Sequence, residues 1–265
     1  MSSIDDLFSR LKADGQTAFM PFITAGDPNL NFTGELLKSL SDAGCHLVEL
    51  GFPYSDPIAD GPTIQDSYTR ALKNKIKVAD IFKMLDSVSG DLKMPVVAMV
   101  SFAIVHRYGT EKFLHRAKAA GLSGLIVPDL PVDESQGLAE LCASNDLSLI
   151  QLVTPTTSDE RALKIAELST GFVYYVSIAG ITGERTSLPD DLASRLEWLK
   201  SKTDKPICVG FGVSQPEQGK MLSQHADGVI VGSAIVGRIG KAENEASAMS
   251  DVVEFAKSML DGVAS

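Results

Sequence analysis

The sequence lacks any block of basic residues. Its 24 lysines and arginines are spread among 34 aspartates and glutamates, for a formal net charge of −10. A protein that binds nucleic acid needs a concentrated positive face, so this charge distribution argues against that class of partner. Any phosphate ligand must be held by local groups, against the overall field of the protein.

Cysteine is scarce in this chain. The three cysteines, Cys45, Cys142 and Cys208, lie far apart, and each sits in or beside an apolar stretch. A disulfide framework typically has an even number of cysteines in a short secreted chain. We therefore expect three reduced, buried thiols.

Clusters of metal-ligand residues are also missing from the sequence. The four histidines are widely separated, at His46, His106, His115 and His225. A zinc site typically combines histidine, cysteine and carboxylate ligands at short spacings. The sequence therefore indicates neither a metal ion nor a redox cofactor.

The N-terminus, MSSIDDLFSRLKADG, has no long apolar run and carries acidic residues. It has the features of neither a secretory signal nor a membrane anchor, so we expect a cytoplasmic protein without a membrane partner. The whole chain is 44% hydrophobic and 22% charged. That composition is typical of a globular protein with a sizeable core.

Short apolar runs, most of them rich in β-branched residues, recur along the whole sequence. Eight of them are candidate strands: Ala18–Thr24, His46–Leu50, Pro95–Val100, Gly124–Pro128, Leu147–Val153, Phe172–Ser177, Pro206–Gly210 and Gly228–Val231. Most show little polar alternation, as expected of parallel strands covered on both faces.

Segments with helical spacing of apolar residues lie between these runs. Examples are Leu36, Leu37, Leu40 and Ala43, then Ile81, Leu85 and Val88, then Phe113, Ala117 and Ala120. Eight strand–helix units favour a closed (βα)8 barrel over an open doubly wound sheet. The dinucleotide fingerprint of the open alternative is missing, because the turn after the first run reads TAGDPN.

Glu49 is the one acidic residue inside the second apolar run. An ionised carboxylate is costly to bury there, and the more common explanation is a backbone or arginine partner. Alternatively, an inward-facing carboxyl group at an apolar barrel mouth would have a raised pKa, which suits a general acid or base.

A long loop follows Glu49 and contains Pro53, Asp56 and Asp60. An acidic loop at a barrel mouth can serve as a lid or as a docking surface. Asp56 precedes a proline and could equally be only a turn-forming residue. Spacing alone leaves these alternatives open.

Three glycine-rich loops follow the last three strands. Barrels frequently bind phosphate at this position through backbone N–H groups and a helix N-terminus. The candidate phosphate contacts are Gly183, Gly212, Gly232 and Ser233.

Four large apolar or aromatic residues are expected at the same rim: Phe22, Ile64, Tyr174 and Phe211. Each taken singly is more simply a cap on the core. Together with a phosphate cradle and a buried carboxyl group, they indicate a pocket for a flat ring joined to a phosphorylated chain.

These motifs are similar to those of a known family. The strings MPFITAGDP, VELGFPYSDPIADGPTIQ, GLIVPDLPVDE, GITGERT, VGFGVS and GVIVGSAIV resemble the tryptophan synthase α-subunit family along the whole chain. The resemblance implies a single-domain TIM barrel over residues 1–265, with an N-terminal helix before the first strand. It also implies a lyase of tryptophan biosynthesis that cleaves indole-3-glycerol phosphate to indole and glyceraldehyde 3-phosphate.

The resemblance also implies roles for individual residues. Glu49 would be the acid–base residue, Asp60 would interact with the indole N–H, and Thr182 would belong to a closing loop that meets Asp60. The same carry-over places the phosphate on Gly183, Gly212, Gly232 and Ser233, and the indole against Phe22, Ile64, Tyr174 and Phe211. Whether Glu49 also deprotonates the glycerol hydroxyl stays open.

In the family, the α-subunit passes indole to a pyridoxal-phosphate-dependent β-subunit. The resemblance therefore implies an αββα heterotetramer in which the cofactor belongs to the β-subunit and this chain holds none. The loop with Pro53 and Asp56 and the loop Gly180–Pro189 would communicate with that partner.

One segment departs from the family pattern. Positions 100–105 read VSFAIV where a TYYNPI-like string is usual, which alters the third βα-loop. This loop is the only support for one alternative, a non-catalytic activator of a β-subunit.

A second alternative is another phosphate-binding barrel, such as an indole-3-glycerol-phosphate synthase or a sugar-phosphate isomerase. It is disfavoured because those enzymes often need a strand-end lysine, and none of the eight runs ends in one.

Overall fold

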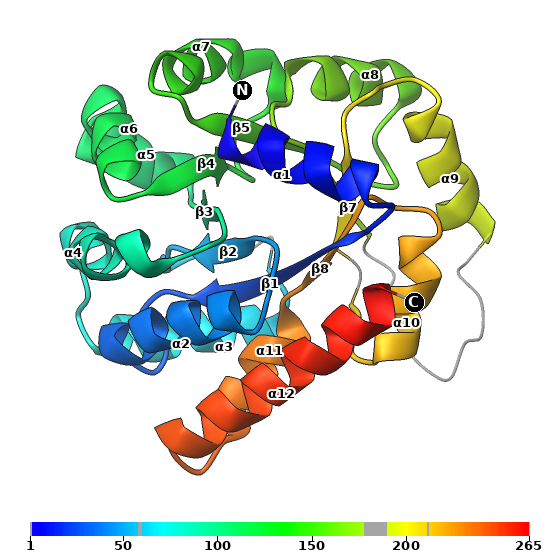
Figure 1. Ribbon diagram of the computed structural model, residues 1–265. Helices are drawn as coiled ribbons and strands as arrows, with labels where there is room; N and C mark the ends of the chain where they lie inside the picture. The colour runs from blue at the N-terminus through cyan, green and yellow to red at the C-terminus, as the bar shows by residue number, and fades with distance from the viewer. Residues whose placement is uncertain (1, 58–59, 178–189, 211, 265) are drawn as a thin grey trace.

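A computed structural model describes residues 2–57, 60–177, 190–210 and 212–264 of the chain. Eight parallel strands pair in sequence order, and β1 pairs with β8, so the sheet closes into a barrel surrounded by helices (Figure 1). The (βα)8 prediction is confirmed, and the open doubly wound alternative is excluded by the β1–β8 pairing.

All eight predicted strands are present. Their bounds are β1 Ala18–Thr24, β2 Val48–Gly51, β3 Val96–Met99, β4 Leu122–Ile126, β5 Ser148–Val153, β6 Val173–Val176, β7 Ile207–Gly210 and β8 Gly228–Val231. The predicted bounds of β1 and β8 were correct, and those of the others shift by one or two residues at one end or both.

The shifts have local causes. Pro95 and Pro206 lack an N–H group, so β3 and β7 each begin one residue later than predicted, although both proline carbonyls still accept hydrogen bonds. At the predicted start of β2 the Phe19 N–H donates to the His46 imidazole Nδ1 at 3.0 Å and not to a backbone carbonyl.

The helices follow the predicted stripes. Their bounds are α1 Ser3–Ala13, α2 Leu30–Asp42, α3 Pro62–Lys73, α4 Val78–Val88, α5 Phe102–Tyr108, α6 Thr110–Ala119, α7 Gln136–Ser144, α8 Asp159–Leu168, α9 Asp190–Lys200, α10 Pro216–Ser223, α11 Ser233–Lys241 and α12 Glu245–Val263. The stripe residues Leu36, Leu37 and Leu40 are buried against the outside of the barrel, as predicted from their spacing.

The first helix, α1, closes the bottom of the barrel. Its buried residues Ile4, Leu7 and Phe8 belong to the same apolar cluster as inward-facing strand residues such as Met20. The Phe8 and Phe172 rings lie 5.7 Å apart between centroids. This contact confirms the expected N-terminal helix, and it leaves the carboxyl ends of the strands as the place for a site.

The three cysteines are all buried and free, as expected: Cys45, Cys142 and Cys208. Cys208 lies in the inner cluster of the barrel, and the other two lie in the layer between strands and helices. Burial raises the pKa of Cys45 and Cys142 to about 12, which keeps both thiols protonated near neutral pH.

Candidate active site

Glu49 points into the barrel from the middle of β2. Its neighbours Val48 and Leu50 pack outward against the helices, so the alternation of a strand turns Glu49 inward. In the strand register Glu49 pairs with Phe22 on β1 and with Val97 on β3. Its exposed fraction is 1%, and among the described residues neither carboxylate oxygen has a hydrogen-bond partner.

This environment changes the acidity of Glu49. Burial, with a smaller contribution from the negative charge of Asp60, raises the pKa of Glu49 from 4.5 to about 8. The alternative of a carboxylate satisfied by a backbone or arginine partner is therefore wrong for the described residues. A carboxyl group that titrates near neutrality can donate a proton and later accept one.

Asp60 comes from the loop between β2 and α3 and lines the same cavity as Glu49. Its side chain is half-buried, which raises its pKa, while a hydrogen bond from the Tyr54 phenol opposes that rise. Burial and the Asp60 charge raise the pKa of Tyr54 to about 12, so Tyr54 remains a proton donor toward the carboxylate.

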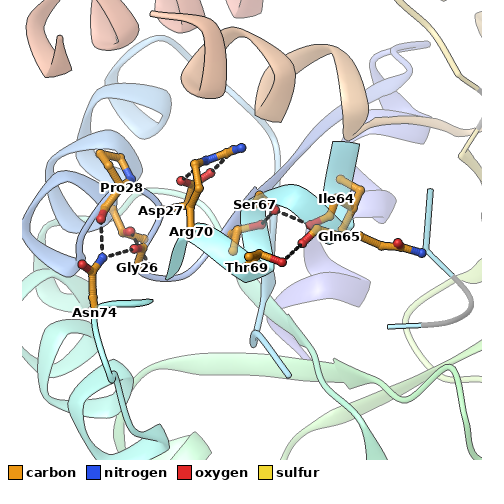
Figure 2. Close-up of polar contacts among 11 residues, drawn as sticks. Gly26, Asp27, Pro28, Ile64, Gln65, Ser67, Thr69, Arg70 and Asn74 are labelled. Carbon is orange, nitrogen blue, oxygen red and sulfur yellow. Dashed lines mark hydrogen bonds and ion pairs between the residues drawn. The ribbon is translucent and has the colours of Figure 1, made fainter. Parts of the chain in front are cut away.

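Helix α3 fixes the loop from its other end (Figure 2). The Ser67 and Thr24 hydroxyls are 2.7 Å apart and hydrogen bonded, so α3 is tied to β1 within the protein interior. Arg70 donates two hydrogen bonds, at 2.7 and 2.8 Å, to the carboxylate of Asp27, whose side chain is 1% exposed. Asn74 donates to the Pro28 carbonyl oxygen. These contacts hold the helix against the β1–α2 loop.

Glu49 and Asp60 share a cavity of about 150 Å³ at the mouth of the barrel. It is lined by Phe22, Glu49, Asp60, Ile64, Met99, Tyr174, Gly210, Gly212, Val213, Ile230, Gly232 and Ser233. The structure thus brings together eight of the predicted site residues: Phe22, Glu49, Asp60, Ile64, Tyr174, Gly212, Gly232 and Ser233. Three predicted site residues, Thr182, Gly183 and Phe211, lie outside the described residues.

Two aromatic rings of this cavity lie over glycines. A Cβ atom on Gly51 would come within 2.5 Å of the Phe22 ring, and one on Gly210 within 2.6 Å of the Tyr174 ring. Only glycine leaves room for the rings at these two positions. The two strands thereby hold flat apolar surfaces beside Glu49.

Four lining residues were missed by the sequence analysis: Met99, Gly210, Val213 and Ile230. The alternation of inward-facing and outward-facing residues along a strand could have identified three of them. Met99 lies two residues after the inward-facing Val97, and Gly210 and Ile230 lie two residues after Cys208 and Gly228. Val213 follows a strand end, where parity no longer applies.

The N-terminus of α11 also lines the cavity. Gly232 is the N-cap residue and Ser233 the first residue of this helix. The first N–H groups of a helix have no intrahelical acceptor, and the helix dipole favours an anion there. The two residues therefore present anion-binding groups to the cavity that holds the carboxyl pair.

A second, larger cavity of about 1040 Å³ lies on the other side of the Asp60 loop. It is lined by Pro53, Tyr54, Ser55, Asp56, Ile76, Lys77, Val78, Ala79, Ser101, Ala103, Ile104, Arg107, Tyr108, Pro128 and Asp129. We call it the outer groove. Pro53 and Asp56, the residues expected to face a partner, both line it, and Asp56 is exposed.

The divergent segment at positions 100–105 forms one wall of the outer groove. The Ser101 hydroxyl donates to Asp129 at 2.6 Å, and the Phe102 N–H donates to the other oxygen of the same carboxylate at 2.8 Å. Ser101 also caps α5 by accepting from the Ala103 N–H. The altered third loop thus leads directly into α5, and its Ser101 and Phe102 are hydrogen bonded to Asp129.

The sequence matches the family model described as "Tryptophan synthase alpha chain" over residues 8–264. A tryptophan synthase alpha chain from Rhodopirellula baltica is 46% identical over 260 residues, which cover 97% of this chain and 94% of that protein. One from Picosynechococcus is 44% identical over the full length of both.

Solved structures give the same result. The crystal structure of tryptophan synthase subunit alpha from Legionella pneumophila superposes with a TM-score of 0.91 at 34% identity, covering 99% of this chain and 98% of that one. A chain in the aminoacrylate-bound crystal structure of tryptophan synthase from M. tuberculosis superposes with a TM-score of 0.88 at 30% identity, covering 99% of this chain and 100% of that one.

Proposed function

The chain belongs to the tryptophan synthase alpha chain family, and from that premise we propose how its residues divide the family's reaction. The reaction is the retro-aldol cleavage of indole-3-glycerol phosphate to indole and glyceraldehyde 3-phosphate. The protein is therefore a carbon–carbon lyase of tryptophan biosynthesis. Pyridoxal phosphate belongs to the β-subunit in this family, and no cofactor is assigned to this chain.

Glu49 is the acid–base residue of the proposal. Cleavage requires a proton at indole C3, because the resulting indolenine accepts the electrons of the breaking C–C bond. A carboxyl group with a pKa of about 8 holds its proton at neutral pH, and the Glu49 side chain is only 1% exposed to solvent. Both properties favour proton transfer to a weakly basic carbon.

Asp60 complements Glu49 electrostatically. Protonation at C3 places positive charge on the ring nitrogen, and an ionised carboxylate that accepts the N–H hydrogen bond stabilises that charge. The Tyr54 phenol, which donates to Asp60, favours the ionised form that this role requires. Glu49 is thus proposed to act protonated and Asp60 ionised, within one cavity.

The remaining lining residues orient the substrate in this proposal. The indole ring lies among Phe22, Ile64 and Tyr174, and the phosphate rests on Gly212 and on the α11 N-terminus at Gly232 and Ser233. Thr182, Gly183 and Phe211 complete the two ends of the substrate site by the family resemblance. A ring held at one end and a phosphate at the other fix the scissile bond between them.

The observation that carries the proposal is the unpartnered, buried carboxyl group of Glu49 facing the cavity that Asp60 also lines. Its test is indole release from indole-3-glycerol phosphate by wild type and by Glu49→Gln. We expect the variant to fold normally and to lose at least about a thousandfold in kcat. Wild-type turnover in the variant would refute the assignment of the acid.

The family implies a β-subunit as partner, and we propose that it docks over the outer groove, next to Pro53 and Asp56. The groove and the catalytic cavity share the Asp60 loop, which would let the partner influence the carboxylate. We further propose an αββα heterotetramer in the cytoplasm. Analytical ultracentrifugation of the two chains mixed tests the stoichiometry.

The same assay in the presence and absence of the β-subunit separates a lyase from a pure activator. A lyase releases indole from indole-3-glycerol phosphate in either case, whereas an activator is silent in both and raises only the turnover of the β-subunit. None of residues 100–105 lines the cavity of Glu49 and Asp60, and Ser101 is hydrogen bonded to Asp129, which supports the lyase over the activator.

A further inference from the structure

Gln65 lies on the first turn of α3, outside both cavities, and its side chain is exposed. Its side-chain amide nevertheless makes two hydrogen bonds to backbone carbonyl groups. The Nε2 group donates to the Asp60 carbonyl oxygen at 2.8 Å and to the Pro57 carbonyl oxygen at 3.3 Å. Figure 2 shows Gln65 at the N-terminal end of α3, beyond the contacts that tie the helix to β1.

The two acceptors are the ends of one turn. The Asp60 N–H donates to the Pro57 carbonyl at 3.1 Å, and we call this hydrogen-bonded pair of residues the turn. Gln65 adds a donor to each end of that turn. This amide group therefore joins the backbone of both residues to the side chain of α3, in addition to the hydrogen bond from Tyr54 to the Asp60 carboxylate.

The helix itself offers the turn no other side-chain cap. The N-cap residue of α3 is Gly61, which has no side chain to accept a hydrogen bond, and Pro62 follows it without an N–H group. The body of the helix is firmly placed by Ser67 and Arg70. Gln65 is thus the connection between a fixed helix and the turn that carries Asp60.

We infer that Gln65 is a positioning residue for Asp60: its amide holds the backbone of Pro57 and Asp60 on α3, so that the Asp60 carboxylate stays in the catalytic cavity. The inference rests on the role proposed above for Asp60. Catalytic groups must be held within about 0.5 Å of their productive position, and hydrogen bonds from a rigid neighbouring element contribute to that. Gln65 acts through Asp60 and does not touch the substrate.

The test is a double-mutant cycle on the full chain, with indole-3-glycerol phosphate as substrate. Gln65→Met keeps the length of the side chain and removes the donor, and Gln65→Glu keeps the shape and offers only acceptors. We expect each to lower kcat about tenfold, while the dissociation constant of inorganic phosphate changes less than about twofold. In an Asp60→Asn background the same changes should lower kcat less than about twofold, because the group they position is already lost.

A matched control is Gln136→Met. Gln136 is also exposed near the start of a helix, α7, lines neither cavity and donates from its side chain, but its acceptor is Glu140 on the same helix, at 3.1 Å, and not the loop that carries Asp60. This variant should keep the wild-type kcat. Melting temperatures of all variants exclude a general loss of folding.

The outcomes are distinguishable. If the Gln65 variants keep the wild-type kcat, lose phosphate affinity in parallel with kcat, or lose the same factor in both backgrounds, the positioning role is overturned. If Asp60→Asn itself turns over like wild type, the role proposed for Asp60 fails first. If Asp60→Asn leaves no measurable rate, the split between kcat and phosphate binding in the Asp60-containing variants decides.

Discussion

Glu49 on β2 lies directly beside Phe22 on β1 in the strand register. On its other side Glu49 pairs with Val97 of β3, so the neighbours of the carboxyl group across the sheet are both apolar. Burial in this setting is the main cause of the raised pKa of Glu49.

The first prediction concerns the pH dependence of catalysis. If protonated Glu49 is the acid, kcat/KM should fall as the pH rises through about 8, with a limiting slope of one decade per pH unit. The acid limb should be set by Asp60, whose pKa burial raises above the ordinary carboxylate value. Initial rates between pH 5 and 10 test this, and a rate that stays constant up to pH 10 would contradict it.

A second prediction follows from the same pKa for stability. Between pH 4.5 and about 8 the unfolded chain has released the Glu49 proton while the folded chain retains it. The folded state then binds more protons, so the contribution of Glu49 to the free energy of unfolding decreases with rising pH and levels off above about 8. The difference between wild type and Glu49→Gln isolates this contribution. Urea denaturation should show the variant gaining relative to wild type as the pH rises; a constant difference would argue against a buried carboxyl group.

Gly232 provides a third prediction. Its backbone does not require glycine, since φ is −106°, and an added Cβ atom would meet the Phe22 side chain only at an ordinary contact distance of 3.5 Å. Gly232→Ala should therefore fold with nearly unchanged stability. If the residue lies against the substrate phosphate, the methyl group should raise KM for indole-3-glycerol phosphate about tenfold or more. An unchanged KM would move the phosphate away from this helix end.

The ion pair between Arg70 and Asp27 supports a fourth prediction. Arg70→Met leaves the buried Asp27 carboxylate without its cation. The free energy of unfolding should decrease by about 2 to 3 kcal/mol. This is less than for a fully buried pair, because Arg70 is one-third exposed. Chemical denaturation measures it. Lys93→Met is the control: Lys93 and Asp42 form a pair of similar length with both side chains exposed, and its loss should cost far less. If both variants lose the same free energy of unfolding, burial does not determine how much an ion pair stabilises the protein.

The fold could be predicted from the sequence because its signal is repeated eight times. An error of two residues in β4 does not disturb a count of strands and helices. The inward orientation of Glu49 could also be anticipated, since a lone acid between outward-facing Val48 and Leu50 has only one other side available.

What could not be predicted arises from contacts between distant segments. The Tyr54 hydrogen bond to Asp60 and the reach of Gln65 back to the turn before α3 depend on the path of the loop, for which residue spacing gives no rule. The same holds for Asp129, which closes the third loop from the neighbouring strand end. The spacing of apolar residues predicts which face of a helix or strand is buried. It does not predict hydrogen bonds between individual atoms of distant segments.

The pairing of β1 with β8 has a consequence for the order in which the protein is made. Phe22 lies just beyond the part of β1 that pairs with β8, and Gly232 follows β8, yet both line one cavity although 210 positions separate them. A ribosome must therefore release nearly the whole chain before this wall of the pocket can exist. Fragments that end before β8 lack Gly232 and Ser233 and the strand that pairs with β1, so they lack this wall of the cavity.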